Sequence, residues 1–170
     1  MTYLIKKQKN AIRISLVIVF SSLVAIGTLI IRIPNPMGGY FNVGDVMIFV
    51  TALTFNPIIG GLASGLGSAV ADIIGGFPTF VIPTLVIKGL EGFIASFLKT
   101  KKNIFRDFLA VFVAGIEMIA GYFIVEYFLW GYGGALAEIP TNIAQIVIGG
   151  LLGIPIAIIL RNRLPNIILE

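Results

Sequence analysis

The sequence contains no cysteine and no histidine among its 170 residues. The absence of cysteine excludes disulfides, iron–sulfur clusters, thiolate zinc sites and a cysteine nucleophile. The absence of histidine removes the usual metal ligand and the usual general base near neutral pH. No other residues form a plausible nucleophile and base, so we expect neither an enzyme nor a metal site. The chain also lacks a Walker motif, so it cannot bind ATP as P-loop proteins do.

Charged residues are scarce as well. They make up 12% of the chain, whereas hydrophobic residues make up 58% and the mean hydropathy is +1.03. Soluble domains contain about 25% charged and about 45–50% apolar residues. The composition therefore predicts an integral membrane protein without a separate soluble domain, in which residues 1–170 form a single unit.

Six apolar runs, separated by proline, glycine and charged residues, predict six helices. We place them at residues 14–33, 46–55, 58–74, 83–98, 108–129 and 141–160. A membrane-spanning helix needs about 20 mostly apolar residues. The predicted fold class is therefore all-α, an integral membrane bundle of six transmembrane helices.

The lysines and arginines gather at alternate ends of these six runs. With a cytoplasmic N-terminus and six spans, ten of them fall inside: Lys6, Lys7, Lys9, Arg13, Lys99, Lys101, Lys102, Arg106, Arg161 and Arg163. Arg32 falls outside and Lys88 lies within a span. Cytoplasmic loops of membrane proteins are enriched in lysine and arginine. This distribution predicts a multi-pass protein of the cell membrane with both termini in the cytoplasm.

The stretch from Gly38 to Asp45 combines three glycines, an amide and a carboxylate between two apolar runs. Polar, irregular backbone at a membrane boundary is tolerated only where water or protein satisfies its hydrogen bonds. We interpret this stretch as an outer loop that covers a pocket for a small solute, whose walls are formed by the other helices.

Ionisable side chains inside the predicted spans are candidates for that pocket, because they are costly in lipid and mark functional sites by default. Lys88 and Glu91 are three residues apart and share one helix face. A self-neutralising structural ion pair between them is an equally good interpretation. Glu117 lies near the middle of the next predicted helix, followed by Tyr122 and Glu126. For Glu117 the alternative is a paired or protonated side chain that only packs.

Amide side chains open the last predicted helix. Asn142 and Gln145 are three residues apart, and amides provide both donors and acceptors, which suits a neutral heterocycle. A hydrogen bond at the helix end explains Asn142 equally well.

Three stretches resemble the S components of energy-coupling factor (ECF) vitamin transporters. They run from Ile31 to Asp45, from Gly67 to Pro78 and from Pro83 to Gly92. The resemblance is strongest to the branch for hydroxymethylpyrimidine, pyridoxine or riboflavin. It implies a subunit that binds a vitamin from outside and docks on a membrane coupling protein. Two ATPase subunits of that complex would use the ATP, so this chain would need no cofactor, and no nucleic acid is expected as a partner.

The resemblance also implies roles for individual residues. A pocket built by the first loop and the last three helices would draw on Asn42, Lys88, Glu91, Glu117, Tyr122, Asn142 and Gln145. The family docks through an alanine-x-x-x-alanine face of the first helix, which matches Ser21 and Ala25 here. Such small residues permit close helix contact, and packing within the monomer is the alternative.

The best candidates for the ligand are hydroxymethylpyrimidine and a pyridoxine-type B6 vitamer, with riboflavin as the alternative. A membrane protein with a purely structural or assembly role is the alternative from another functional class.

Overall fold

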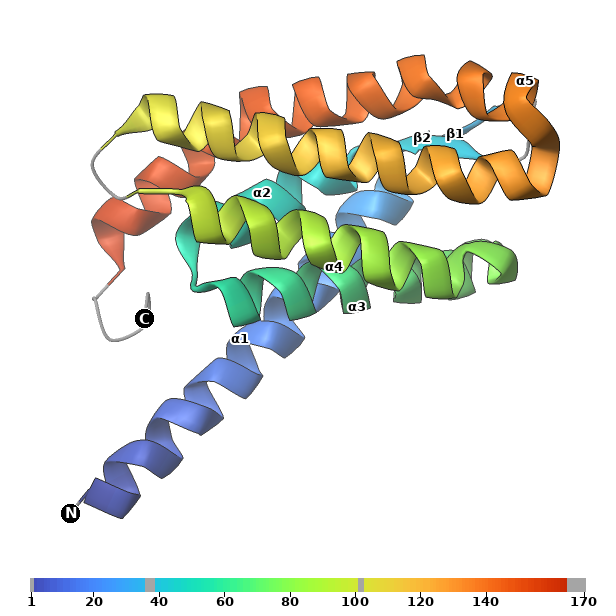
Figure 1. Ribbon diagram of the computed structural model, residues 1–170. Helices are drawn as coiled ribbons and strands as arrows, with labels where there is room; N and C mark the ends of the chain where they lie inside the picture. Colours follow the sequence, from blue (N-terminus) through green and yellow to red (C-terminus); the bar gives the residue numbers. More distant parts are fainter. Residues whose placement is uncertain (1, 36–38, 101–102, 165–170) are drawn as a thin grey trace.

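The computed structural model describes residues 2–35, 39–100 and 103–164 (Figure 1). Its elements, in chain order, are α1 (Thr2–Ile30), β1 (Arg32–Pro34), β2 (Tyr40–Asn42), α2 (Gly44–Thr54), α3 (Pro57–Gly75), η1 (Pro78–Phe80), α4 (Val81–Leu98) and α5 (Ile104–Arg163). The molecule is mainly helical, as predicted. In the described residues, four helices are long and apolar enough to cross a membrane, and α5 is the longest of them.

Helix α5 folds back on itself at Gly131. This residue has φ 73° and ψ −178°, a conformation that is essentially restricted to glycine. The two arms of α5 then run side by side in opposite directions (Figure 1). They correspond to the predicted helices at 108–129 and 141–160. Helical structure resumes directly after Gly131 and continues through Pro140.

Helix α2 is shorter than the about 20 residues that a membrane span usually needs, and it forms the centre of the bundle. Its 11 residues span about 16 Å at a rise of 1.5 Å per residue. It contacts all four longer helices. Ile48, Phe49 and Leu53 on α2 are fully buried and form the core with Val24 of α1 and Ile154 of α5. The predictions of six spans and of cytoplasmic termini stay predictions.

Helices α3 and α4 pack very closely at their glycines. A Cβ atom at Gly65 would lie 2.6 Å from the carbonyl oxygen of Leu85, so no larger residue fits. On the outside of the bundle the exposed side chains include many large aliphatic and aromatic residues, among them Ile74, Phe97 and Phe128. This surface is suited to lipid.

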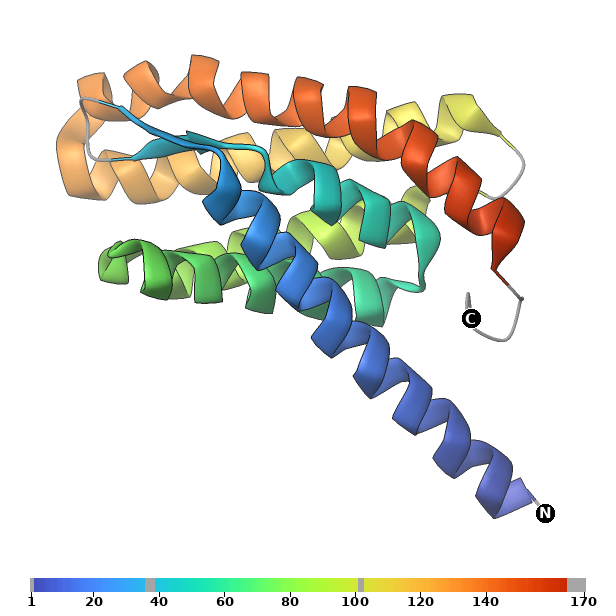
Figure 2. The ribbon, with the colours of Figure 1, turned by 180° about the vertical axis from the view of Figure 1, so that it is seen from behind.

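A two-stranded hairpin, which the sequence analysis expected to be a loop, connects α1 to α2. β1 pairs with β2 in antiparallel register, with Ile33 opposite Phe41. Proline disfavours helix in the residue before it, so Ile33 is extended and α1 ends at Ile30 rather than at the predicted residue 33. Figure 2 shows the hairpin beside the turn of α5, at one end of the bundle.

Candidate functional site

A polar pocket lies where β2, α3, η1, α4 and both arms of α5 meet. Its volume is about 40 Å³. The residues that line it are Gly39, Tyr40, Asn42, Asp72, Phe77, Phe80, Thr84, Tyr122, Glu126, Glu138, Asn142 and Gln145. Four of the seven predicted pocket residues are among them: Asn42, Tyr122, Asn142 and Gln145.

Three amide side chains form a continuous chain along the pocket. Asn42 Nδ2 donates to Gln145 Oε1 at 2.6 Å, and Gln145 Nε2 donates to Asn142 Oδ1 at 3.3 Å. Asn42 Oδ1 also accepts from the backbone N–H of Gly44 at 2.9 Å, at the start of α2. All three amides are buried. The hairpin is thereby joined to both α2 and the second arm of α5.

Aromatic rings form another side of the pocket. The rings of Phe80 and Tyr122 are 6.5 Å apart, and Phe80 lies 5.6 Å from the ring of Trp130. Tyr122 Oη donates to Thr84 Oγ1 at 3.1 Å, which fixes the tyrosine ring against α4. These rings provide flat apolar surfaces on which a planar ligand can pack.

The hairpin region is fastened over the pocket at two points. Tyr40 Oη donates to Asp72 Oδ1 of α3 at 2.6 Å, and Asn35 Nδ2 donates to Glu138 Oε2 of α5 at 2.5 Å. Burial, reinforced by the Asp72 charge, raises the pKa of Tyr40, so its hydroxyl stays protonated and keeps donating. The guanidinium of Arg32 lies 5.5 Å from the centre of the Tyr40 ring.

The remaining three predicted pocket residues lie outside the pocket lining. Lys88 Nζ is 2.5 Å from Asp45 Oδ1 and 2.9 Å from Glu91 Oε2, and all three side chains are buried. The ion pair between Lys88 and Glu91 is therefore present, and Asp45 of α2 extends it. Lys88 Nζ lies 5.8 Å from the centre of the Tyr122 ring, so this cluster supports one wall of the pocket. Glu117 is half-buried and interacts electrostatically with Lys88. Ligand contact by Lys88, Glu91 and Glu117 stays a prediction.

Several residues that line the pocket are not among the seven predicted pocket residues, most notably Asp72, Glu138 and Tyr40. Their positions in the sequence could have indicated them. Each lies near a predicted helix end, at the same end of the predicted bundle as the loop at Gly38–Asp45. Tyr40 belongs to that loop itself.

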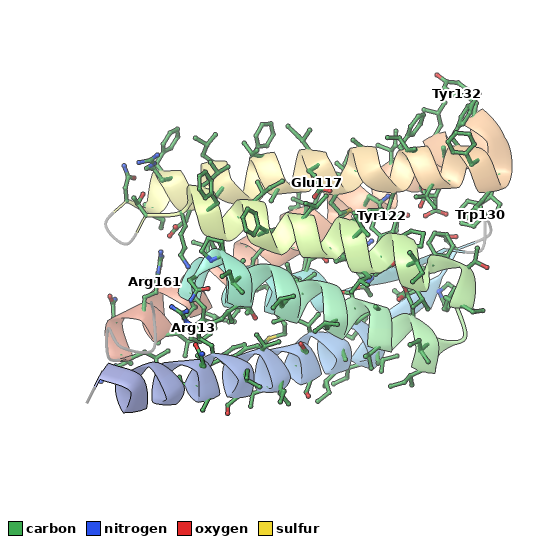
Figure 3. The ribbon with its side chains drawn as sticks, turned by 60° about the horizontal axis from the view of Figure 1, so that its bottom comes forward. Arg13, Glu117, Tyr122, Trp130, Tyr132 and Arg161 are labelled. Atoms are coloured by element: carbon green, nitrogen blue, oxygen red, sulfur yellow. The ribbon has the colours of Figure 1, made fainter. Side chains whose placement is uncertain are left out.

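The two ends of the bundle differ in their chemistry. Figure 3 shows Tyr122 and Trp130 toward the turn of α5, whereas Arg13 and Arg161 lie toward the opposite end. At that opposite end Arg161 forms a bidentate ion pair with Asp107. Lys99 Nζ donates to the carbonyl oxygens of Ala52 and Phe55 at the end of α2.

The predicted docking residues face the interior to different degrees. Ala25 is 7% exposed and Ser21 is half-buried. The neighbouring Val24 packs very closely on α3. A Cβ atom added at Gly67 would lie 2.7 Å from the Cβ atom of Val24. Packing within the chain, the alternative considered from the sequence, therefore accounts for Ala25. The docking role stays a prediction.

Comparisons with known proteins agree with this architecture. A protein from Pyrococcus woesei, named "uncharacterized protein in gap 3'region", is 44% identical over 147 residues, which cover 85% of this chain and 99% of that protein. The thiamine precursor transporter HmpT of Lactococcus lactis subsp. cremoris is 27% identical over 146 residues, covering 85% of this chain and 84% of HmpT. The family model of the ECF-type riboflavin transporter S component matches residues 8–162. This chain therefore belongs to the family of ECF-type riboflavin transporter S components, and it is a multi-pass membrane transport subunit, not an enzyme.

Proposed function

We propose that this chain captures a small heterocyclic vitamin or vitamin precursor at the outer membrane face and delivers it to a membrane coupling protein. Two ATPase subunits of that complex supply the energy. Hydroxymethylpyrimidine or a pyridoxine-type B6 vitamer is the ligand that fits best. The observation that carries this proposal is the chain of amides from Asn42 through Gln145 to Asn142, in a pocket covered by the hairpin.

The chemistry of the lining suits a flat ring with polar substituents. Each amide can donate to a ring nitrogen and accept from an amino or hydroxyl group. The rings of Phe80 and Tyr122 offer apolar surface for the faces of the ligand. Ligand sites commonly combine such aromatic walls with a few placed polar groups.

The size of the pocket favours a small ligand. Its volume is about 40 Å³, whereas pockets for drug-sized ligands enclose about 300–1,000 Å³. Any vitamin therefore requires the pocket to widen, most simply by release of the hairpin at Tyr40 and Asn35. One six-membered ring requires less widening than the three fused rings of riboflavin. The name of HmpT supports a precursor, and the name of the family model makes riboflavin the second candidate.

The proposed orientation places the pocket outside and the basic end inside. Arg13 and Arg161 lie at the end opposite Trp130 (Figure 3). The positive-inside rule then puts both described ends of the chain at the cytoplasmic side. The arms of α5 count as two of six helices in this arrangement, with α2 as the short buried one.

Binding to the purified protein tests this proposal. Native mass spectrometry identifies any co-purified ligand, and thermal unfolding is then measured with hydroxymethylpyrimidine, pyridoxine and riboflavin. We expect a one-ring compound to raise the unfolding temperature and to do so more than riboflavin. A larger rise with riboflavin would reassign the ligand. No rise with any vitamin in a broader panel would overturn the proposed function.

A further inference from the structure

Three carboxylates from separate parts of the fold line the same pocket. Asp72 comes from α3, Glu126 from the first arm of α5 and Glu138 from the second arm. Their side chains are 1%, 4% and 3% exposed, respectively. Glu126 and Glu138 are close enough to repel each other electrostatically. The pocket therefore concentrates carboxyl groups next to the amide chain.

The protein provides only part of the hydrogen bonding that these carboxylates can accept. Asp72 and Glu138 each accept one hydrogen bond from the hairpin region, from Tyr40 and Asn35. The second oxygen of Asp72, Oδ2, and the Oε2 oxygen of Glu126 are buried without a hydrogen-bond partner in the described part of the chain. These two oxygens are acceptors that a ligand can satisfy.

Lys88 and Arg32 interact with groups other than Glu126. Lys88 is held by Asp45 and Glu91, whereas Arg32 lies over the rings of Tyr40 and Phe77 and interacts electrostatically with Asp72. None of the ion pairs among the described residues includes Glu126. A charged carboxylate buried without a positive partner is unfavourable, so a positive group from outside the protein would stabilise the charged form of Glu126.

We propose that the ligand supplies this group, and that the protein selects a vitamin or precursor carrying a protonated amine, placed between Glu126 and Glu138. This inference rests on the proposed function and narrows its substrate class from small heterocycles in general to those that carry a positive charge. The two glutamates lie on opposite arms of α5 and both line the pocket. The amide chain then binds the ring, and the carboxylates bind its charged substituent.

A pair of matched probes tests the charge directly. Hydroxymethylpyrimidine and its aminomethyl analogue differ only in that CH₂NH₃⁺ replaces CH₂OH. Pyridoxine and pyridoxamine differ in the same way. Equilibrium dissociation constants for the full-length protein are measured at neutral pH by calorimetry. We expect the amine of at least one pair to bind at least tenfold more tightly than its alcohol.

Variants locate the origin of that preference. In Glu126→Gln and Glu138→Gln the ratio of the two dissociation constants should fall to about two or less. Asp107→Asn removes a negative charge from the same helix at the opposite end of the bundle and should keep the wild-type ratio. If a glutamine variant fails to fold, comparing the amine and alcohol probes on the wild-type protein still tests whether the protein prefers a charged ligand.

The possible results separate this inference from the proposed function. Equal binding of amine and alcohol in both pairs overturns the inference alone, and so does an unchanged ratio in both folded pocket variants. If none of the four compounds and no other vitamin binds, the proposed function fails as well.

Discussion

At the scale of single residues, Lys88 is the positive centre of a buried cluster that joins α4 to α2. Its Nζ atom contacts carboxylates of both helices, Asp45 at 2.5 Å and Glu91 at 2.9 Å. Removing one partner of a buried ion pair is costly because it leaves the other charge uncompensated in a medium of low dielectric constant. Lys88 therefore stabilises the wall against which Tyr122 packs.

Replacing this lysine should destabilise the protein. We expect Lys88→Met to lower the free energy of unfolding by about 3–5 kcal/mol, because Asp45 and Glu91 lose their positive partner. Thermal or denaturant unfolding in detergent measures the change. The matched control is the triple variant with Asp45→Asn and Glu91→Gln, which removes all three charges and should recover most of the loss. A Lys88→Met protein as stable as wild type would contradict the stabilising role of this ion-pair cluster.

The sequence spacing predicted the pairing of Lys88 with Glu91 but not the contact of Lys88 with Asp45. Lys88 and Glu91 are one helical turn apart, so their pairing follows from local geometry. Asp45 is 43 residues from Lys88, and Asn42 is 103 residues from Gln145. Such contacts depend on how the helices pack, which no local pattern encodes.

At the scale of elements, the turn of α5 depends on one glycine. Gly131 has a positive φ of 73° with an extended ψ, and a Cβ atom there would be strained even though it would meet no neighbour within 4 Å. The sequence indicated a break in this region from its glycines. The sequence did not show that a single residue is enough to reverse the helix direction. Helix and loop at Gly131–Gly134 differ in backbone dihedral angles, which the amino-acid composition does not reveal.

An alanine at this turn should measurably destabilise the fold. We expect Gly131→Ala to lower the free energy of unfolding by about 1–3 kcal/mol, the typical cost of forcing a larger residue into such a conformation. Gly133→Ala is the matched control. A Cβ atom at Gly133 would also meet no neighbour within 4 Å, but Gly133 has no positive φ. Equal stability of the two variants in denaturant unfolding would contradict this account of the turn.

The hairpin is the element that we expect to control access to the pocket. Tyr40→Phe removes the hydrogen bond to Asp72, and a hydrogen bond to a charged group contributes about 1.5–3 kcal/mol. We therefore expect ligand association and dissociation to accelerate by about tenfold or more. The single tryptophan, Trp130, contacts the pocket residue Phe80 and provides a stopped-flow fluorescence signal.

A second tyrosine, which is exposed, serves as the control for this experiment. Tyr132 is 63% exposed, and Tyr132→Phe should leave both rate constants unchanged. Wild-type rates in Tyr40→Phe would mean that ligand enters without release of the hairpin from α3.

At the scale of the whole molecule, a short buried helix is surrounded by longer apolar ones, with a polar pocket at one end and arginines at the other. Composition and charge distribution predicted the membrane bundle because lipid imposes the same requirements on every spanning helix. They did not predict that α2 would be central, because its apolar sequence resembles that of a spanning segment.

The exposed side of α1 is the place to test docking. Ser22 is exposed and lies beside Ser21, whereas Ala25 is buried. We expect Ser22→Trp to keep vitamin binding but to reduce co-purification with the coupling protein by about tenfold, because a large side chain prevents close helix contact. Ile116→Trp, at an exposed position of α5, is the control and should assemble normally. Normal assembly of Ser22→Trp would place docking elsewhere.

The most direct test of the central claim is the affinity of purified protein for hydroxymethylpyrimidine and pyridoxine, compared between wild type and Gln145→Leu. Gln145 is the middle amide of the pocket, and leucine is similar in size but cannot form hydrogen bonds. We predict tight binding of at least one compound to wild type and at least tenfold weaker binding to the variant, with both proteins folded. Equal affinity in the two folded proteins would contradict the assignment of this pocket as the vitamin site.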